Sequence, residues 1–344
     1  MYKIEKEKLT ALFQMIAADQ ELFLPIRNGG QVNFGPWSEA VEVDLETLNS
    51  VKSPKDVFFP QSENLYTVKQ NDGHMCIEPE ELKNQDFVVF GIRPCDVKGV
   101  EVLDKVFLVD PLDSYYAARR EHATLVSMAC NEPEETCFCK AFGIDCVEPG
   151  GDVAVWRVGE ELYWKPLNEK GEALTDKVKS LLVEAEESCV AEQQAAVRKI
   201  VEKLPYADLS LDGWNGEALD AKFNSDIWEK LYTPCLACGT CTFVCPTCQC
   251  YDIKDYDTGS SGVQRYRCWD SCMYSDFTMM AHGNNRTNQM QRFRQRFMHK
   301  LVYFPANNGG MYSCVGCGRC VAKCPASLNI VKVIKAFQEK GGEL

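Results

Sequence analysis

Two runs of cysteine in the last third of the chain carry its clearest chemical signal. In each run two, two and three residues separate the four cysteines, and a proline follows the fourth. The runs are Cys235, Cys238, Cys241 and Cys245, and then Cys314, Cys317, Cys320 and Cys324. Bacterial ferredoxins that hold two [4Fe–4S] clusters have this spacing, and in them the fourth cysteine of a run binds the other cluster.

Each predicted cluster therefore takes ligands from both runs. We expect cluster one to bind Cys235, Cys238, Cys241 and Cys324, and cluster two to bind Cys314, Cys317, Cys320 and Cys245. Gly239 and Gly318 would let the backbone approach the inorganic sulfide closely. Two zinc ribbons are the alternative, but zinc ribbons use pairs of cysteines with a longer gap between the pairs.

A third set of cysteines lies in the first half of the chain and consists of Cys95, Cys130, Cys137 and Cys139. Cys95 and Cys130 closely follow predicted strands, and the ends of such strands meet at one edge of a sheet. We predict a third cluster there, with buried free thiols as the alternative. Cys76, Cys146 and Cys189 stand alone and are interpreted as ordinary thiols.

A further group of cysteines comes after the first run. Cys248, Cys250 and Cys272 have a spacing that fits an additional metal site, and Cys268 lies between them. A structural role around cluster one is the alternative. Residues 286–300 also carry five positive charges and no acid, at Arg286, Arg292, Arg294, Arg296 and Lys300. These cations either form a solvated face, or raise the cluster potentials or dock an acidic partner.

The elements that must position these residues fall into two predicted domains. Residues 1–220 alternate apolar strands with helices and predict an α/β domain, whereas residues 221–344 predict a mainly α-helical ferredoxin-type domain with two [4Fe–4S] clusters. A linker is expected over 204–216. The expected strands are 86–91, 123–128 and 153–158, and the expected helices are 3–18, 177–204, 224–232, 269–282 and 286–302.

Bulk properties exclude several classes of protein. The 344 residues carry a net charge of −13, divided as −19 over 1–230 and +6 over 231–344. The modest basic excess argues against a nucleic-acid partner. No apolar run approaches the roughly 20 residues of a membrane helix, and the first residues do not form a secretory signal. We therefore expect a cytoplasmic protein with no membrane span. No GxGxxG or P-loop pattern indicates a nucleotide site.

Several segments together resemble a known family. They resemble the β subunit of cytoplasmic sulfhydrogenases and, similarly, the dicluster electron-transfer subunit of anaerobic sulfite reductase. In the first half these segments are Phe90–Asp96, Leu103–Phe107, Tyr116–Glu121 and Thr136–Cys139. In the second half they are Cys245–Cys250, Trp269–Met273 and His299–Lys300. The likeness extends from about Ser53 to Val333, and it also favours the third cluster.

The resemblance implies an electron-transfer subunit of an anaerobic redox complex. Such a subunit relays electrons between a partner subunit that binds flavin and NAD(P) and a catalytic subunit of hydrogenase, sulfite reductase or heterodisulfide-reductase type. No side chain of this chain is then expected to be catalytic. One alternative is that the chain itself reduces a small substrate at an unusual cluster held by Cys248, Cys250, Cys268 and Cys272. A zinc-stabilised scaffold without redox chemistry is the other.

Overall fold

The structure is a computed structural model that describes residues 1–71, 74–259 and 262–341. A nine-stranded mixed sheet forms the first half of the molecule, with the order β11-β1-β10-β9-β8-β7-β2-β3 and β4 paired to β2. Its strands are β1 (Tyr2–Glu5), β2 (Glu21–Asn28), β3 (Gln31–Pro36), β4 (Glu42–Val43), β7 (Phe87–Ile92), β8 (Ala123–Met128), β9 (Val153–Val158), β10 (Glu161–Pro166) and β11 (Val183–Glu184).

Parallel strands occupy the centre of this sheet. β7 pairs with β2 and β8, and β8 pairs with β9, in parallel register. Every residue of β7 and β8 is buried, as expected for parallel strands that are covered on both faces. The strands predicted over 86–91, 123–128 and 153–158 are confirmed.

Helices cover both faces of the sheet. α1 (Leu9–Ala17) and α5 (Glu169–Val178) pack on the face that carries Val88 and Phe90. Phe87 and Val89 point to the opposite face, which is covered by α2 (Lys55–Phe58), α3 (Pro94–Phe107) and α4 (Ser114–His122). This three-layer arrangement confirms the α/β class that was predicted for the first part of the chain.

Two predicted helices of this half are wrong in part. Residues 2–5 of the expected helix 3–18 form β1, because they pair with both β10 and β11. The expected helix 177–204 is broken: α5 ends at Val178, and β11 interrupts the segment before α6 (Ser188–Val201) begins. Four 3-10 helices also occur, namely η1 (Lys6–Lys8), η2 (Cys139–Phe142), η3 (Lys179–Leu181) and η4 (Gly216–Ala218).

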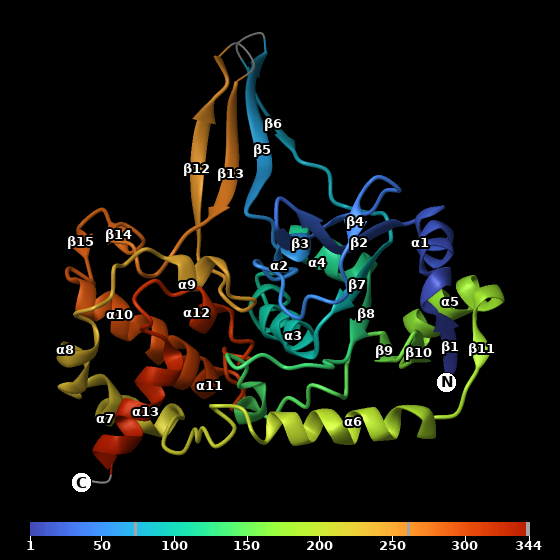
Figure 1. Ribbon diagram of the computed structural model, residues 1–344. Coiled ribbons are helices and arrows are strands. Elements are labelled where there is room, and N and C mark those ends of the chain that lie inside the picture. The colour runs from blue at the N-terminus through green and yellow to red at the C-terminus, as the bar shows by residue number, and fades with distance from the viewer. Residues whose placement is uncertain (72–73, 260–261, 342–344) are drawn as a thin grey trace.

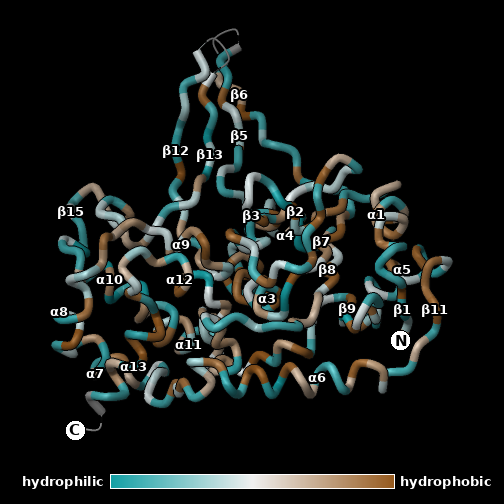
Figure 2. Tube along the Cα trace, viewed as in Figure 1, coloured by the Kyte–Doolittle hydropathy of each residue, from teal (hydrophilic) through white to brown (hydrophobic). Residues whose placement is uncertain are grey.

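α6 runs along the base of the molecule toward a second, helical core (Figure 1). In Figure 2 hydrophobic and hydrophilic colours alternate along α6, as expected for a helix with one covered face. The second core contains Trp228, Phe293, Phe297 and Ile334. Its helices are α7 (Leu219–Phe223), α8 (Ile227–Leu231), α9 (Thr240–Phe243), α10 (Gln289–Met298), α11 (Phe304–Asn307), α12 (Arg319–Ala322) and α13 (Ile330–Gly341), and a π-helix spans His299–Tyr303.

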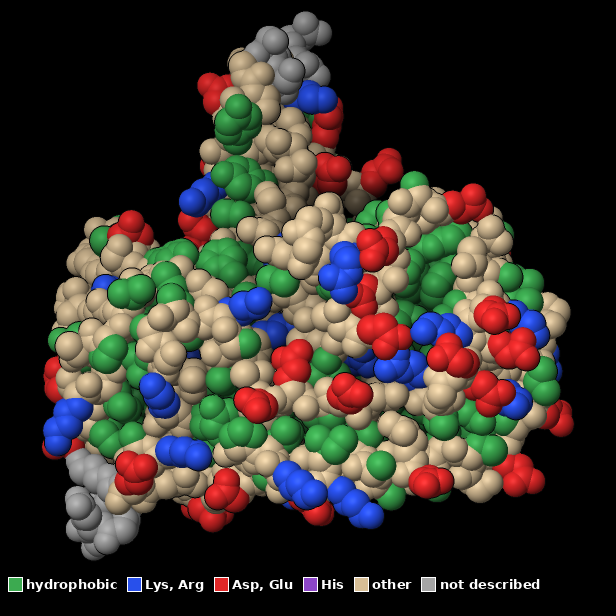
Figure 3. Space-filling model, in the orientation of Figure 1, with side chains coloured by type: hydrophobic (Ala, Val, Ile, Leu, Met, Phe, Trp, Pro, Cys, Tyr) green, Lys and Arg blue, Asp and Glu red, His purple; other side chains and the backbone are tan. Residues whose placement is uncertain are grey.

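A four-stranded antiparallel sheet projects from the molecule, and we call it the arm (Figure 1). Its order is β12 (Tyr251–Asp257), β13 (Val263–Trp269), β5 (Ser62–Asn71) and β6 (His74–Pro79). Hydrophobic side chains lie exposed on it (Figure 3), among them Met75 and Tyr256. Because β5 pairs with β13, the arm joins residues on either side of position 220, where the predicted domain boundary stays a prediction.

The arm also changes the picture of the second half. The expectation that residues 221–344 are mainly α-helical is not confirmed, because this half supplies β12 and β13 and a small hairpin of β14 (Met279–Met280) and β15 (Gly283–Asn284). The helix predicted over 269–282 is wrong, since Trp269 ends β13 and turns come after it. The helix predicted over 286–302 is confirmed in α10 and the π-helix. In the part of the chain that the structure describes, no helix has the length and apolarity to cross a membrane.

Candidate iron–sulfur sites

The first cysteine run and the last cysteine of the second run line one pocket. Its four thiols belong to Cys235, Cys238, Cys241 and Cys324. Most of the remaining wall is apolar and includes Phe293 and Phe297, and Arg296 is its charged member. Gly239 takes a φ of +73° before α9, where an added Cβ would lie 2.7 Å from the Tyr274 ring, so the chain turns here only with glycine.

The second cysteine run lines a neighbouring pocket together with the last cysteine of the first run. The thiols here belong to Cys245, Cys314, Cys317 and Cys320. Phe138, Arg296 and Lys300 complete much of the wall. Sets of four cysteines are the ligands that [4Fe–4S] clusters require, so the donor chemistry of both pockets fits two such clusters. Binding by these eight residues stays a prediction.

Two short helices exchange the fourth cysteines between the pockets. α9 carries Cys241 into the first pocket, and the chain then delivers Cys245 to the second. α12 packs against α9 and does the reverse with Cys320 and Cys324. Because about one helical turn separates the two cysteines of each pair, a single helix serves both pockets.

The structure sorts the five cations of residues 286–300 into two kinds. Arg296 and Lys300 are each 3% exposed and lie at the pockets. Arg296 lines both pockets, and its Nε has no hydrogen-bond partner among the described residues. Arg292 instead donates to the carbonyl oxygens of Met273 and Arg286, and Arg294 stacks on the ring of Phe223. Only Arg296 and Lys300 of this group therefore face the thiols.

Lys300 and Cys245 stabilise each other in their charged forms. Burial disfavours the ammonium of Lys300, but the thiolates of Cys245 and Cys248 outweigh burial and raise the pKa of Lys300 above its ordinary value. The pKa of Cys245 lies well below its ordinary value, because the Cys248 thiol lies beside it and Lys300 adds its positive charge. Lys300 also donates hydrogen bonds to Thr247 and to the carbonyl oxygen of Ser313.

The third set of cysteines lies where β7 and β8 end. Cys95 begins α3 directly after β7, and Cys130 follows β8, so the two parallel strands bring them to one edge of the sheet. Burial raises the pKa of Cys137 to about 12, and its charge neighbours include Cys139 and Cys130. The structure thus gathers the four cysteines that the sequence groups, although Cys95 faces Cys317 more than the other three.

Cys146, which the sequence leaves as an isolated thiol, lies in this third set. The amide of Cys130 donates to the carbonyl oxygen of Cys146 at 2.9 Å, and the Cys146 thiol interacts with the thiols of Cys130 and Cys139. Local spacing could not reveal this, because 15 residues separate Cys130 from Cys146. Asn49 is a second residue that sequence reasoning missed, and its side-chain amide donates to Cys137 Sγ at 3.9 Å.

Cys248, Cys250 and Cys272 form another group of neighbouring thiols. The amide of Asp270 donates to the carbonyl oxygen of Cys250, which holds the segment after β13 beside the segment before β12. The Cys272 thiol beside Cys250 lowers the pKa of Cys250 to about 7. Lys55, which the sequence did not single out, is 3% exposed and donates to the carbonyl oxygen of Cys248 at 2.8 Å.

Cys268 does not share that environment. It lies in β13, where its partners across the arm are Asp252 and Ser62. The charges around it come from Lys254, Asp252 and Asp270. The four-cysteine site suggested for the catalytic alternative is therefore reduced to three neighbouring thiols. Among the described residues, no group of three or more His, Cys, Asp or Glu side chains is arranged to hold a single metal ion.

Comparison with known proteins gives the same picture of the second half and extends it to the whole chain. Residues 234–328 match the 4Fe-4S dicluster domain family. Sulfhydrogenase 2 subunit beta of Pyrococcus furiosus is 31% identical over 350 aligned residues, which cover 98% of each chain. The chain belongs to the sulfhydrogenase β-subunit family. No solved structure matches it.

Membership of the sulfhydrogenase β-subunit family agrees with the resemblance seen in the short sequence segments. The match to the dicluster domain begins one residue before Cys235 and ends four residues after Cys324, so it includes both cysteine runs. The whole-chain alignment also includes the third set and the arm. This sulfhydrogenase β-subunit homologue therefore has the iron–sulfur, electron-transfer character that its cysteine runs predict.

Proposed function

We propose that this chain is the electron wire of a cytoplasmic anaerobic redox complex, joining a partner subunit that binds flavin and NAD(P) to a catalytic subunit. The observation that carries the proposal is the pair of four-thiol pockets that share Arg296 as a common wall. When bound there, [4Fe–4S] clusters supply one-electron transfer. The relative from Pyrococcus furiosus is a subunit of a sulfhydrogenase, which favours a hydrogenase as the catalytic partner.

The side chains of this chain hold and tune rather than react. The eight cysteine thiolates would bind the two clusters, and the apolar walls exclude water from them. Arg296 and Lys300 offset the negative charge that thiolate ligation brings into a buried region. No side chain is assigned a bond-making step.

The surface near the first pocket supports transfer to a partner. Cys238 is exposed, and Leu236 in the same loop is 68% exposed. The second pocket is deeper, since Cys245 and Cys317 are buried. A cytoplasmic location is supported by the cysteines, because all 19 are free thiols, as is usual in a reducing compartment.

Anaerobic purification of the full chain tests the cluster content. Two four-iron clusters give a brown protein with at least about eight irons and eight acid-labile sulfides per chain. Reduction with dithionite should produce the electron paramagnetic resonance signals of [4Fe–4S]⁺. A colourless protein with stoichiometric zinc would overturn the proposal in favour of the scaffold.

Purification of the complex through a tag on this chain tests the wire. We expect a flavin-containing subunit and a catalytic subunit to co-purify. In a complex carrying Cys314→Ala, NAD(P)H should still reduce the partner's flavin, while electrons should no longer reach the catalytic subunit. Cys76→Ala is the matched control, because Cys76 is exposed on β6. Unchanged transfer in the Cys314→Ala complex would contradict the role.

The catalytic alternative has one observation in its favour, the group of Cys248, Cys250 and Cys272 beside Lys55. Three thiolates would leave one iron of a cluster free to bind a substrate. Turnover of a small substrate by the isolated chain with an artificial electron donor would support this alternative. Turnover that requires the partner subunit supports the wire.

A further inference from the structure

We propose that Cys130, Cys137, Cys139 and Cys146 hold a third [4Fe–4S] cluster, between the pocket of cluster two and a surface cavity beside α6. This inference deepens the electron-transfer function proposed above and rests on it. It alters the ligand set expected from the sequence, because Cys146 replaces Cys95.

Three separate segments bring the four thiols together. Cys130 follows β8, Cys137 and Cys139 lie at the start of η2, and Cys146 lies in the loop that leads to β9. The backbone hydrogen bond from Cys130 to Cys146 holds the loop against the strand end. The thiols of Cys130, Cys137 and Cys146 are buried, and each has at least one other thiol of the set as a neighbour.

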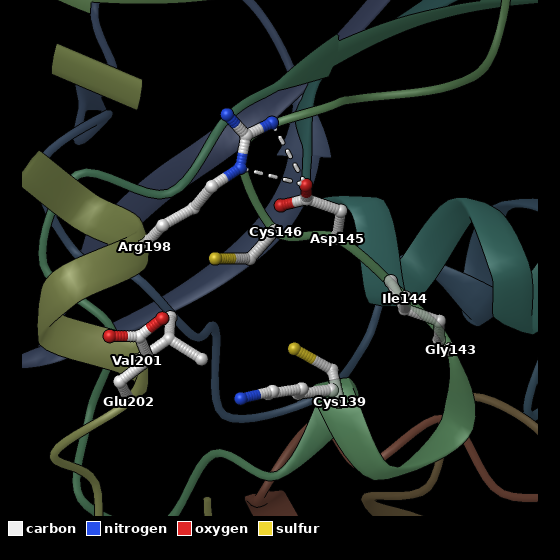
Figure 4. A pocket seen from close by; sticks show the side chains of 9 residues that line it. Cys139, Gly143, Ile144, Asp145, Cys146, Arg198, Val201 and Glu202 are labelled. Carbon is white, nitrogen blue, oxygen red and sulfur yellow. Dashed lines mark hydrogen bonds and ion pairs between the residues drawn. The ribbon is translucent and has the colours of Figure 1, made fainter. Parts of the chain in front are cut away.

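A cavity opens beside two of these thiols. It has a volume of about 290 Å³ and is lined by Cys139 and Cys146, by the turn around Asp145, and by Arg198 and Glu202 at the end of α6. Figure 4 shows the sulfur atoms of Cys139 and Cys146 pointing into this same space. The cavity therefore lies where a cluster bound by these thiols would come nearest to solvent and to a docked partner.

The opposite side of the third set abuts the pocket of cluster two. Phe138, between Cys137 and Cys139, lines that pocket, and its amide donates to the carbonyl oxygen of Gly316 at 2.9 Å. Gly316 has a φ of +60°, and an added Cβ would lie 2.4 Å from the carbonyl oxygen of Phe138. Only glycine permits this approach, which keeps the third set against the second cysteine run.

Asn49 makes a second connection between the two sites. Its side-chain amide donates to the carbonyl oxygen of Cys317 at 3.2 Å and contacts Cys137 Sγ. One buried amide therefore touches a cysteine of each set. The three sites follow one another as cluster one, cluster two and the third site, with a surface near each end of the series.

Cys95 is left out because it lies on the other side of this boundary. It packs with Val315 and Cys317, and it precedes Asp96, whose carboxylate pairs with Arg319. Four other thiols already supply the number of ligands that a [4Fe–4S] cluster takes. Cys95 is then a buried thiol next to cluster two.

Iron counting on the full-length chain, purified without oxygen, tests the third site. The wild type should contain about 12 irons and 12 acid-labile sulfides, and both Cys146→Ala and Cys139→Ala should contain about eight of each. Cys189→Ala and Cys95→Ala should keep about 12, because Cys189 is exposed on α6 and Cys95 is not a proposed ligand. Retained resonance signals of clusters one and two show that a variant has folded.

Alkylation of the wild type provides a measurement that needs no variant. Iodoacetamide should label Cys189 at once, but label Cys146 and Cys139 only after the iron has been chelated. Immediate labelling of Cys146 would overturn the proposal, and so would about 12 irons in Cys146→Ala or a loss of four irons in Cys95→Ala. A wild type with about eight irons removes the third site and leaves the two-cluster wire, whereas an iron-free chain removes both.

Discussion

The Nζ atom of Lys300 lies 3.4 Å from the Sγ atom of Cys245, and both side chains are buried. A buried cation with no carboxylate beside it is costly unless another anion balances it. Here the anions are thiolates, so the ammonium favours the more negative, reduced state of whatever those thiolates hold. The same reasoning applies to Arg296, which stands between the two pockets.

Replacing Lys300 with Met should lower the midpoint potential of cluster two. A unit charge at about 4 Å contributes about 4 kcal/mol at an effective dielectric constant of 20, so a negative shift on the order of 100 mV is expected. Redox titration followed by electron paramagnetic resonance measures it. Lys323→Met removes an exposed charge from the second cysteine run and should leave the potential nearly unchanged. Equal shifts in the two variants would refute the role of Lys300.

Replacing Arg296 with Gln should lower the potentials of both clusters, because this guanidinium lines both pockets. Arg294→Gln is the matched control on the same helix, since Arg294 stacks on Phe223 instead. Arg296→Lys keeps the charge and should restore most of the shift. A change in one potential alone would show that Arg296 does not serve both clusters.

Pairs of cysteine substitutions test which thiols share a cluster. Cys235→Ala and Cys324→Ala should each remove about four irons, and the double variant should lose no more than either one. Cys314→Ala combined with Cys324→Ala should instead remove about eight. Additive loss in the first pair would show that Cys324 binds with its own run.

The buried ion pair between Asp96 and Arg319 should stabilise the contact between the two halves. Its two hydrogen bonds measure 2.6 and 2.9 Å, and both side chains are almost fully buried. Arg319→Gln leaves the carboxylate unpaired and should cost about 3–5 kcal/mol, seen as a lower thermal unfolding midpoint. Arg265→Gln breaks the exposed pair with Asp255 on the arm and should cost less than about 1 kcal/mol.

Much of this organisation could be predicted because it is encoded locally. Apolar runs such as 123–128 are buried on both faces, so composition alone identifies them as strands. The spacing of the cysteine runs groups the same thiols that the structure places around each pocket, although cluster binding itself stays a prediction.

The failures involve partners that are distant in the sequence. Residues 2–5 share a helical pattern with the residues up to position 18, but two distant strands pair with them and outweigh that preference. Residues 251–257 carry alternating charges and become β12 because β13 lies beside them. Cys146 carried no signal of its own, since its neighbours in space are supplied by a backbone contact with the end of β8.

The arm has a consequence for how the protein is made. β5 leaves the ribosome early, but its neighbour β13 is encoded about 200 residues later. The nascent chain must therefore carry β5 with one edge open until the first cysteine run has already emerged. Closure of the arm marks the moment when synthesis has passed that run, which gives maturation factors an interval in which the first four cysteines are accessible.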